Sequence, residues 1–183
     1  DSLLKPYLAL DKAVEGMFVV AHKLYGLHFT PTDEVEKYHS EVQTYKVTDA
    51  EGNYVALLYT DFFPRAGKRN GAWMTTFKDQ YIDLQGNDSR PHISIVCNFT
   101  RPTATEPSLL TFNELTTLFH EFGHALHGML SRVTYPSLSG TNVARDFVEL
   151  PSQLMENWCY EEETLRLFAT HYQTGEPLPM EWV

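Results

Sequence analysis

The chain has 183 residues, of which 43% are hydrophobic and 21% charged, as is typical of a folded globular domain with its own core. A formal net charge of −10 and the absence of any basic cluster argue against a nucleic-acid partner. No apolar run approaches the roughly 18 residues of a membrane span, and Cys97 and Cys159 are too few for a disulfide framework. We therefore expect neither nucleic acid nor a membrane as a partner.

The first part of the chain predicts a helix followed by a hairpin. Apolar residues recur at helical spacing over 3–27, where Gly26 is a suitable stop. The segments 42–47 and 54–63 are rich in strand-forming residues, and polar turn residues separate them, so an antiparallel hairpin is expected. The loop over 64–71 lacks the spacing of a phosphate-binding loop, so nucleotide binding is not expected there.

A third strand is predicted over 91–99, where apolar residues alternate with a mixed set that includes Ser94 and Asn98. If this is an edge strand, its free backbone groups can pair with an extended peptide, and the mixed face can line a peptide groove. Ser94 and Asn98 are therefore candidate substrate-binding residues. The competing interpretation is a strand whose mixed face meets only solvent.

A helix is strongly predicted next. Thr111 is a suitable N-cap, and Glu114 three residues later completes a capping box. Helix formers follow through 115–130. The segment 137–142 after this helix is a loop of small residues that should border the same region. Its amides, including that of Gly140, could hold a substrate carbonyl, or the glycine could simply permit the turn.

This predicted helix carries a His-Glu-x-x-His motif. Successive helical residues turn by about 100°, so His120 and His124 lie on one face and can bind one metal ion. Glu121 lies between them in angle, where its carboxylate can reach a metal-bound water and act as a general base. Catalytic zinc takes three protein ligands and keeps a fourth position open, so one Zn²⁺ per chain and a third ligand are predicted. His127 is about 10 Å further along the helix, and we interpret it as a packing or supporting residue.

The third ligand is expected to be a carboxylate. Metzincins would place glycine and histidine three and six residues after the second histidine, but those positions hold His127 and Leu130. Glu149 comes 25 residues after His124, which fits a helix end, a loop and the start of an antiparallel second helix.

The second helix is expected over about 145–174. Pro151 is unfavourable in its interior, so the regular helix either starts near Leu150 or kinks there. Glu156 could accept a hydrogen bond from a metal-bound histidine, and Asp146 competes for this role. The elements together predict a mainly α chain with a small antiparallel sheet, an α+β class, in which the motif helix packs on the helix that carries the third zinc ligand.

These motifs resemble the thimet oligopeptidase family of zinc peptidases, and within it most closely the bacterial dipeptidyl carboxypeptidases. The matching stretches are His-Glu-Phe-Gly-His-Ala-Leu-His-Gly at 120–128, Ser-Gly-Thr-Asn at 139–142, Asp-Phe-Val-Glu-Leu-Pro-Ser-Gln at 146–153, Gly-Lys-Arg-Asn-Gly-Ala-Trp-Met at 67–74 and Leu-Lys-Pro-Tyr at 4–7. They span nearly the whole chain. The resemblance implies that His120, His124 and Glu149 bind zinc and that Glu121 is the general base.

The resemblance also implies a function. It predicts zinc-dependent hydrolysis of peptide bonds in oligopeptides with release of C-terminal dipeptides, the alternatives being an oligoendopeptidase and a non-catalytic module that binds metal or peptide. Family members are longer and mostly helical, so residues 1–183 are expected to be a single partial catalytic domain whose partners include the rest of the parent protein. The sequence favours the cytoplasm and leaves the periplasm and export open.

In the family, the groups that stabilise the oxyanion come from a later segment of tyrosines and a histidine. No stretch after 171–172 matches that segment. We therefore expect the chain to bind zinc but to have weak or no peptidase activity by itself.

Overall fold

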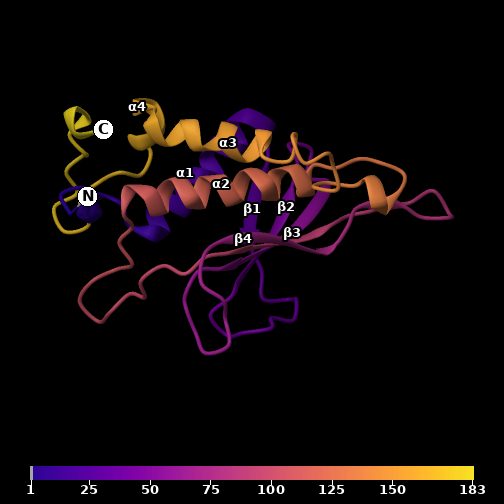
Figure 1. Cartoon of the computed structure of the whole chain (residues 1–183), viewed down its shortest axis with the longest axis horizontal. Helices are drawn as coiled ribbons and strands as arrows, with labels where there is room; N and C mark the ends of the chain where they lie inside the picture. The colour runs from indigo at the N-terminus through magenta and orange to yellow at the C-terminus, as the bar shows by residue number, and fades with distance from the viewer. Residues whose placement is uncertain (1) are drawn as a thin grey trace.

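The computed structural model describes residues 2–183, in which helices cover one face of a sheet (Figure 1). Within this range the helices are α1 (Leu10–Tyr25), α2 (Phe112–Met129), α3 (Leu150–Glu156) and α4 (Glu162–Leu165). The strands are β1 (His28–Pro31), β2 (Gln43–Thr48), β3 (Tyr54–Asp61), β4 (Trp73–Lys78), β5 (Tyr81–Ile82), β6 (Asp88–Ser89) and β7 (His92–Val96). The α+β class is confirmed. None of the helices in residues 2–183 combines the length and apolar character that a membrane crossing requires.

The main sheet is mixed, so the expectation of an antiparallel sheet is wrong in one respect. Its strand order is β1-β2-β3-β7-β4, and β3 pairs with β7 in parallel, whereas the other neighbours are antiparallel. The predicted hairpin is confirmed as β2 and β3. The mixed topology arises because β4, β5 and β6 lie between β3 and β7 in the sequence, so the chain returns to β3 in the same direction.

The strand predicted over 91–99 is confirmed as β7, but its interpretation as an edge strand is wrong, because β7 lies inside the sheet between β3 and β4. The edge beside β7 is formed by β4, for which the sequence analysis predicted no strand. Strand β7 is covered on both faces: Ile93 and Ile95 are fully buried in the main core, and Ser94 on the opposite face is fully buried as well. The fully buried Ser94 therefore cannot offer its side chain to a peptide groove.

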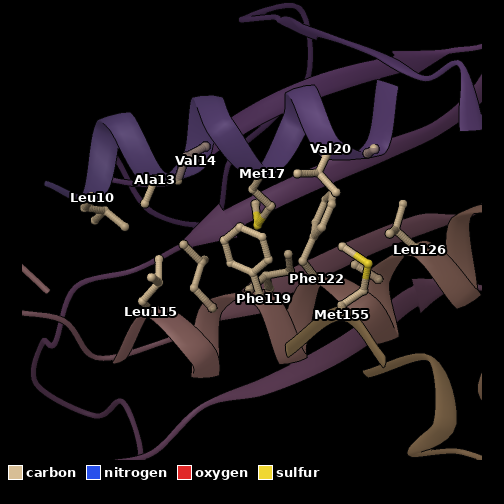
Figure 2. Close-up of a cluster of buried hydrophobic side chains, with 14 of the residues drawn as sticks. Leu10, Ala13, Val14, Met17, Val20, Leu115, Phe119, Phe122, Leu126 and Met155 are labelled. Carbon is tan, nitrogen blue, oxygen red and sulfur yellow. The ribbon is translucent and has the colours of Figure 1, made fainter. Parts of the chain in front are cut away.

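The main core lies between α1, α2 and the sheet. Figure 2 shows side chains of α1 and α2 pointing toward one another, joined by Met155 of α3. Phe119 and Phe122 are fully buried, and each such side chain contributes about 1.5–3 kcal/mol relative to exposure. This packing fixes the face of α2 that points inward, and the histidines of the motif lie beside it.

The first helix is shorter than predicted but ends as predicted. Regular helix begins at Leu10 because Ala9 is extended, with ψ 133°, and pairs with Leu109. Gly26 ends α1 in the left-handed region at φ 69°, a conformation that glycine adopts without steric strain. The predicted capping box of α2 is confirmed, because Glu114 N–H donates to the Thr111 hydroxyl and Thr111 N–H donates to the Glu114 carboxylate.

The prediction of one long second helix over about 145–174 is wrong. Helix α3 starts at Leu150 with Pro151 in its first turn, where the missing N–H of proline is tolerated, and it ends at Glu156. A 3-10 turn follows, and Glu161 is extended, with ψ 126°, before the short helix α4. Of the two expectations for Pro151, a helix start near Leu150 is the one observed.

Candidate metal centre

Three side chains from α2 and the start of α3 converge on one point. His120 and His124 lie one turn apart on α2, with ring centroids separated by 4.9 Å. The carboxylate oxygen Oε2 of Glu149 lies 3.1 Å from Nε2 of each histidine. One ligand atom from each of the three residues lies within 4.8 Å of the others.

A glycine inside the motif permits this convergence. A Cβ added to Gly123 would lie 2.5 Å from Cα of Ser152 and 2.6 Å from the carbonyl oxygen of Pro151. Both are backbone atoms of α3, so no side-chain rotation could make room. Only glycine allows α3 to approach α2 closely enough for Glu149, the residue before α3, to reach both histidines.

The protonation states favour coordination. The Ser152 hydroxyl donates to Oε2 of Glu149 at 2.8 Å, and this hydrogen bond, with the two nearby histidines, lowers the pKa of that carboxyl. Burial lowers the pKa of His124, so its imidazole is neutral at pH 7. An ionised carboxylate and a neutral imidazole are the forms that bind a metal ion.

Glu156, rather than Asp146, supports a histidine. The carboxylate Oε1 of Glu156 lies 3.0 Å from Nδ1 of His120, the ring nitrogen that faces away from Glu149. In residues 2–183 no hydrogen bond or ion pair joins Asp146 to a histidine. His127 packs near Phe147, with ring centroids 6.0 Å apart, as its packing interpretation predicts.

Glu121 lies beside the three converging side chains and is itself only 7% exposed. Burial raises the pKa of its carboxyl, and the Glu149 carboxylate adds to this shift, whereas His120 opposes it. A carboxylate with a raised pKa accepts a proton more readily than a solvated one.

A cavity of about 390 Å³ opens onto these residues. One wall is formed by the four residues already described, His120, Glu121, His124 and Glu149. The opposite wall is formed at the start of β4 by Ala72, Trp73 and Met74, and the remaining lining residues are Thr141 and Val148. The cavity therefore lies between the motif helix and the edge strand of the sheet.

The whole chain, residues 1–183, matches the model of peptidase family M3. The chain belongs to this family. It is 43% identical over 182 residues to dipeptidyl carboxypeptidase of Escherichia coli, covering 99% of this chain and 26% of the relative. It is 42% identical to oligopeptidase A of Escherichia coli, covering 99% and 27%, and 38% identical to a thimet-like oligopeptidase of Dictyostelium discoideum, covering 100% and 28%.

These comparisons confirm the resemblance to the oligopeptidase family, and they carry two further facts. The chain spans about a quarter of the length of the curated relatives it matches. Its identities to the dipeptidyl carboxypeptidase and to oligopeptidase A are nearly equal, so sequence identity does not separate these two relatives.

The donor set of this M3 chain fits zinc. Two ligand atoms, each about 2.0–2.1 Å from one ion and at a tetrahedral angle, lie about 3.4 Å apart. The 3.1 Å separations between Glu149 Oε2 and each histidine Nε2 are close to this value. Two imidazoles and one carboxylate beside an open cavity match the donor types that catalytic zinc takes in other proteins.

None of the three predicted substrate-binding residues is among those that line the metal cavity. Ser94 is fully buried, with its hydroxyl 3.4 Å from that of Tyr38. Asn98 donates to the backbone carbonyls of Arg69 and Gly71, so it holds a loop in place. The amide of Gly140 donates to the Ser131 hydroxyl at 3.0 Å, which leaves this N–H engaged within the chain.

Two contributors to this site, Ser152 and strand β4, were not predicted from the sequence. Ser152 follows Glu149 by three residues, a spacing at which side chains meet on a helical turn, and this signal could have been read. Strand β4 was missed although its sequence, Trp-Met-Thr-Thr-Phe-Lys, is rich in strand formers. Its position at the sheet edge beside the metal cavity depends on strand order, for which the sequence holds no local signal.

Proposed function

We propose that this chain binds one zinc ion through His120, His124 and Glu149, on the packed pair α2 and α3, and that it forms the catalytic site of a peptidase acting on oligopeptides. The observation that carries the proposal is the convergence of these three donors next to the buried carboxylate of Glu121, at an open cavity. Membership of peptidase family M3 supports the same reaction.

In the proposed reaction Glu121 moves the protons. Zinc, when bound, would polarise the scissile carbonyl and lower the pKa of a water ligand to about 7. Glu121 would accept the proton of the attacking water and pass it to the leaving amine, a role suited to its raised pKa. Glu156 would hold His120 in the orientation and tautomer that leave Nε2 free for the metal.

The substrate is proposed to lie along β4. This edge strand pairs with β7 on one side only, and its first residues line the metal cavity. Free N–H and C=O groups on an edge strand can bind an extended peptide without regard to its side chains. Binding of this kind suits a peptidase with many oligopeptide substrates.

The position of the cleaved bond is a separate proposal. Release of C-terminal dipeptides and internal cleavage are both compatible with this site, and a relative named dipeptidyl carboxypeptidase and one named oligopeptidase A are similar to this chain to nearly the same degree. We retain dipeptide release as the first proposal and oligoendopeptidase activity as the second. Mass analysis of the products from a peptide with a free C-terminus and from its C-terminal amide distinguishes them.

Zinc binding tests the site directly. The purified chain is expected to hold about one zinc ion, and Glu149→Gln to weaken zinc binding by at least about 100-fold, because one of three ligands is lost. Glu156→Gln is expected to weaken it by about 10–100-fold, because His120 loses its support. Competition with a chromophoric chelator measures these affinities.

Asp146→Asn is the matched control, since this carboxylate lies near Glu149 along the chain but has no histidine contact among residues 2–183. It is expected to leave zinc affinity unchanged. Equal losses of zinc affinity in Asp146→Asn and Glu149→Gln would overturn the proposed ligand set.

Glu121→Gln separates an enzyme from a binding module. The variant is expected to keep zinc and to lose at least about 100-fold of any turnover, because the amide cannot accept the proton. A fluorogenic oligopeptide follows hydrolysis, with the exposed Glu163→Gln as the matched control. We expect weak turnover by the wild-type chain, and a measurable wild-type rate that is unchanged in Glu121→Gln would rule out this catalytic role.

A further inference from the structure

A second hollow lies along β4, in a different position from the metal cavity. It has a volume of about 430 Å³, and Trp73, Thr75 and Phe77 of β4 form one wall. Trp73 also borders the metal cavity, so the two hollows meet at this side chain. Alternate residues of a strand point to opposite faces, so Trp73 and Thr75 share one face and Met74 lies on the other. The register shifts between Thr76 and Lys78, and Phe77 at this irregularity lines the same hollow as Trp73 and Thr75.

This hollow carries an excess of positive charge in a chain whose net charge is −10. Arg65, Lys68 and Arg69 line it, and Asp61 is the one carboxylate among its lining residues. Tyr38 also lines it, and burial chiefly raises the pKa of its hydroxyl to about 12, so this group adds no negative charge. Three cations therefore face one anion.

Asp61 is fully engaged by two of these cations. Arg65 donates to both of its carboxylate oxygens, at 2.7 and 3.0 Å, and Lys68 donates to Oδ1 at 3.0 Å. Lys68 also reaches the backbone carbonyls of Asp61, Phe63 and Cys97, so its ammonium has no donor left for a ligand. These contacts make the floor of the hollow rigid.

Arg69 is the cation that remains available. Within residues 2–183 its guanidinium has no hydrogen-bond acceptor and no ion pair, and it stacks over the Trp73 ring at 5.1 Å. The backbone that carries it is held by Asn98, whose amide donates to the carbonyls of Arg69 and Gly71. Stacking leaves the edge of a guanidinium, where its N–H groups lie, free for a planar anion.

We propose that this hollow is a carboxylate-binding subsite of the substrate groove, in which Arg69 binds a carboxylate of a peptide lying along β4. The inference rests on the proposed peptidase function, and it adds a determinant of substrate choice. A peptide paired with the free edge of β4 points alternate side chains toward the Trp73 face. A carboxylate on that face, from an acidic side chain or from the peptide C-terminus, meets the guanidinium of Arg69.

Binding of four peptides tests the subsite. The peptides share one sequence of six residues, have an acetylated N-terminus, and end in either a free acid or an amide, with either glutamate or glutamine at one position. The zinc-loaded chain with Glu121→Gln keeps them intact. Affinity is measured by fluorescence anisotropy, and the NMR signals of the Trp73 indole N–H and the Arg69 Nε–H report the place of binding.

Peptides with a carboxylate are expected to bind about tenfold more tightly than the neutral peptide and to shift both NMR signals. Arg69→Gln should abolish this preference without changing the affinity for the neutral peptide. Arg132→Gln, at an exposed arginine outside the hollow, should preserve it. A preference that follows the free acid identifies the C-terminus as the bound group, and one that follows glutamate identifies a side chain.

Equal affinity for all four peptides, a preference that survives Arg69→Gln, or no shift of the two signals overturns the subsite. None of these results bears on zinc content or hydrolysis, which test the proposed function separately. A chain without zinc that still prefers carboxylate peptides through Arg69 would retain the subsite and lose the peptidase function.

Discussion

Gly123→Ala is expected to abolish stoichiometric zinc binding and to lower the free energy of unfolding by about 2–3 kcal/mol. The new methyl group would meet Cα of Ser152 and the carbonyl oxygen of Pro151 at 2.5 and 2.6 Å. Backbone atoms cannot rotate away, so α3 must move from α2 and carry Glu149 away from the histidines. Urea denaturation and metal analysis of the purified variant measure the two effects.

Gly128→Ala on the same helix is the matched control, because alanine raises helix propensity equally at both positions. Its methyl group would meet Cδ1 of Ile93 at 2.8 Å, and this atom is the end of a flexible side chain. We expect Gly128→Ala to change the free energy of unfolding by less than about 1 kcal/mol and to keep zinc. Loss of zinc in both variants, or in neither, would contradict the claim that glycine is needed at position 123 for α3 to approach α2.

Arg90→Met is expected to lower the free energy of unfolding by about 3–5 kcal/mol. The Arg90 side chain is 7% exposed and donates to the carbonyl oxygens of Val55, Met129 and Ser131 as well as to Asp88. Met129 is the last residue of α2, so the guanidinium binds a carbonyl that the helix itself leaves without a partner. Methionine keeps much of the side-chain volume but leaves these buried acceptors unpaired.

Arg132→Met is the matched control for Arg90→Met, because Arg132 also pairs with the carboxylate of Asp88. Arg132 lies 4.0 Å from Asp88, but its side chain is 65% exposed. The substitution Arg132→Met should therefore change the free energy of unfolding by less than about 0.5 kcal/mol. Thermal and urea unfolding of both variants give the comparison. Similar small effects in the two would show that the carbonyl contacts of Arg90 contribute little.

The features that the sequence predicted well depend on short-range chemistry. The capping box of Thr111 and Glu114 and the facing of His120 and His124 follow from helical geometry over a few residues. The placement of Glu149 could also be anticipated, because the third histidine of a metzincin is absent and a carboxylate from a following helix is the other common third donor. The structure brings these donors together, while their role as ligands remains a prediction.

The features that escaped prediction depend on distant parts of the chain. Apolar alternation in β7 indicates a strand, but it does not tell whether β4 or solvent lies beside it. The prediction of a continuous helix over 145–174 is wrong at Glu161, where the backbone is extended. Neither Glu161 nor its neighbours are residues that strongly break a helix. Such breaks are decided by packing against other elements, which outweighs local propensity.

The parallel pairing of β3 with β7 bears on the order in which the chain folds. It joins Leu57 to His92, about 35 positions apart, whereas the β2–β3 hairpin closes over a short turn. The hairpin can therefore form early. Strands β4 and β7 can pair before β7 docks on β3, because Lys78 and His92 are closer in sequence than Leu57 and His92. Among residues 2–183 the wall that would receive a peptide is held by one neighbouring strand, so it is among the first parts of the sheet to open.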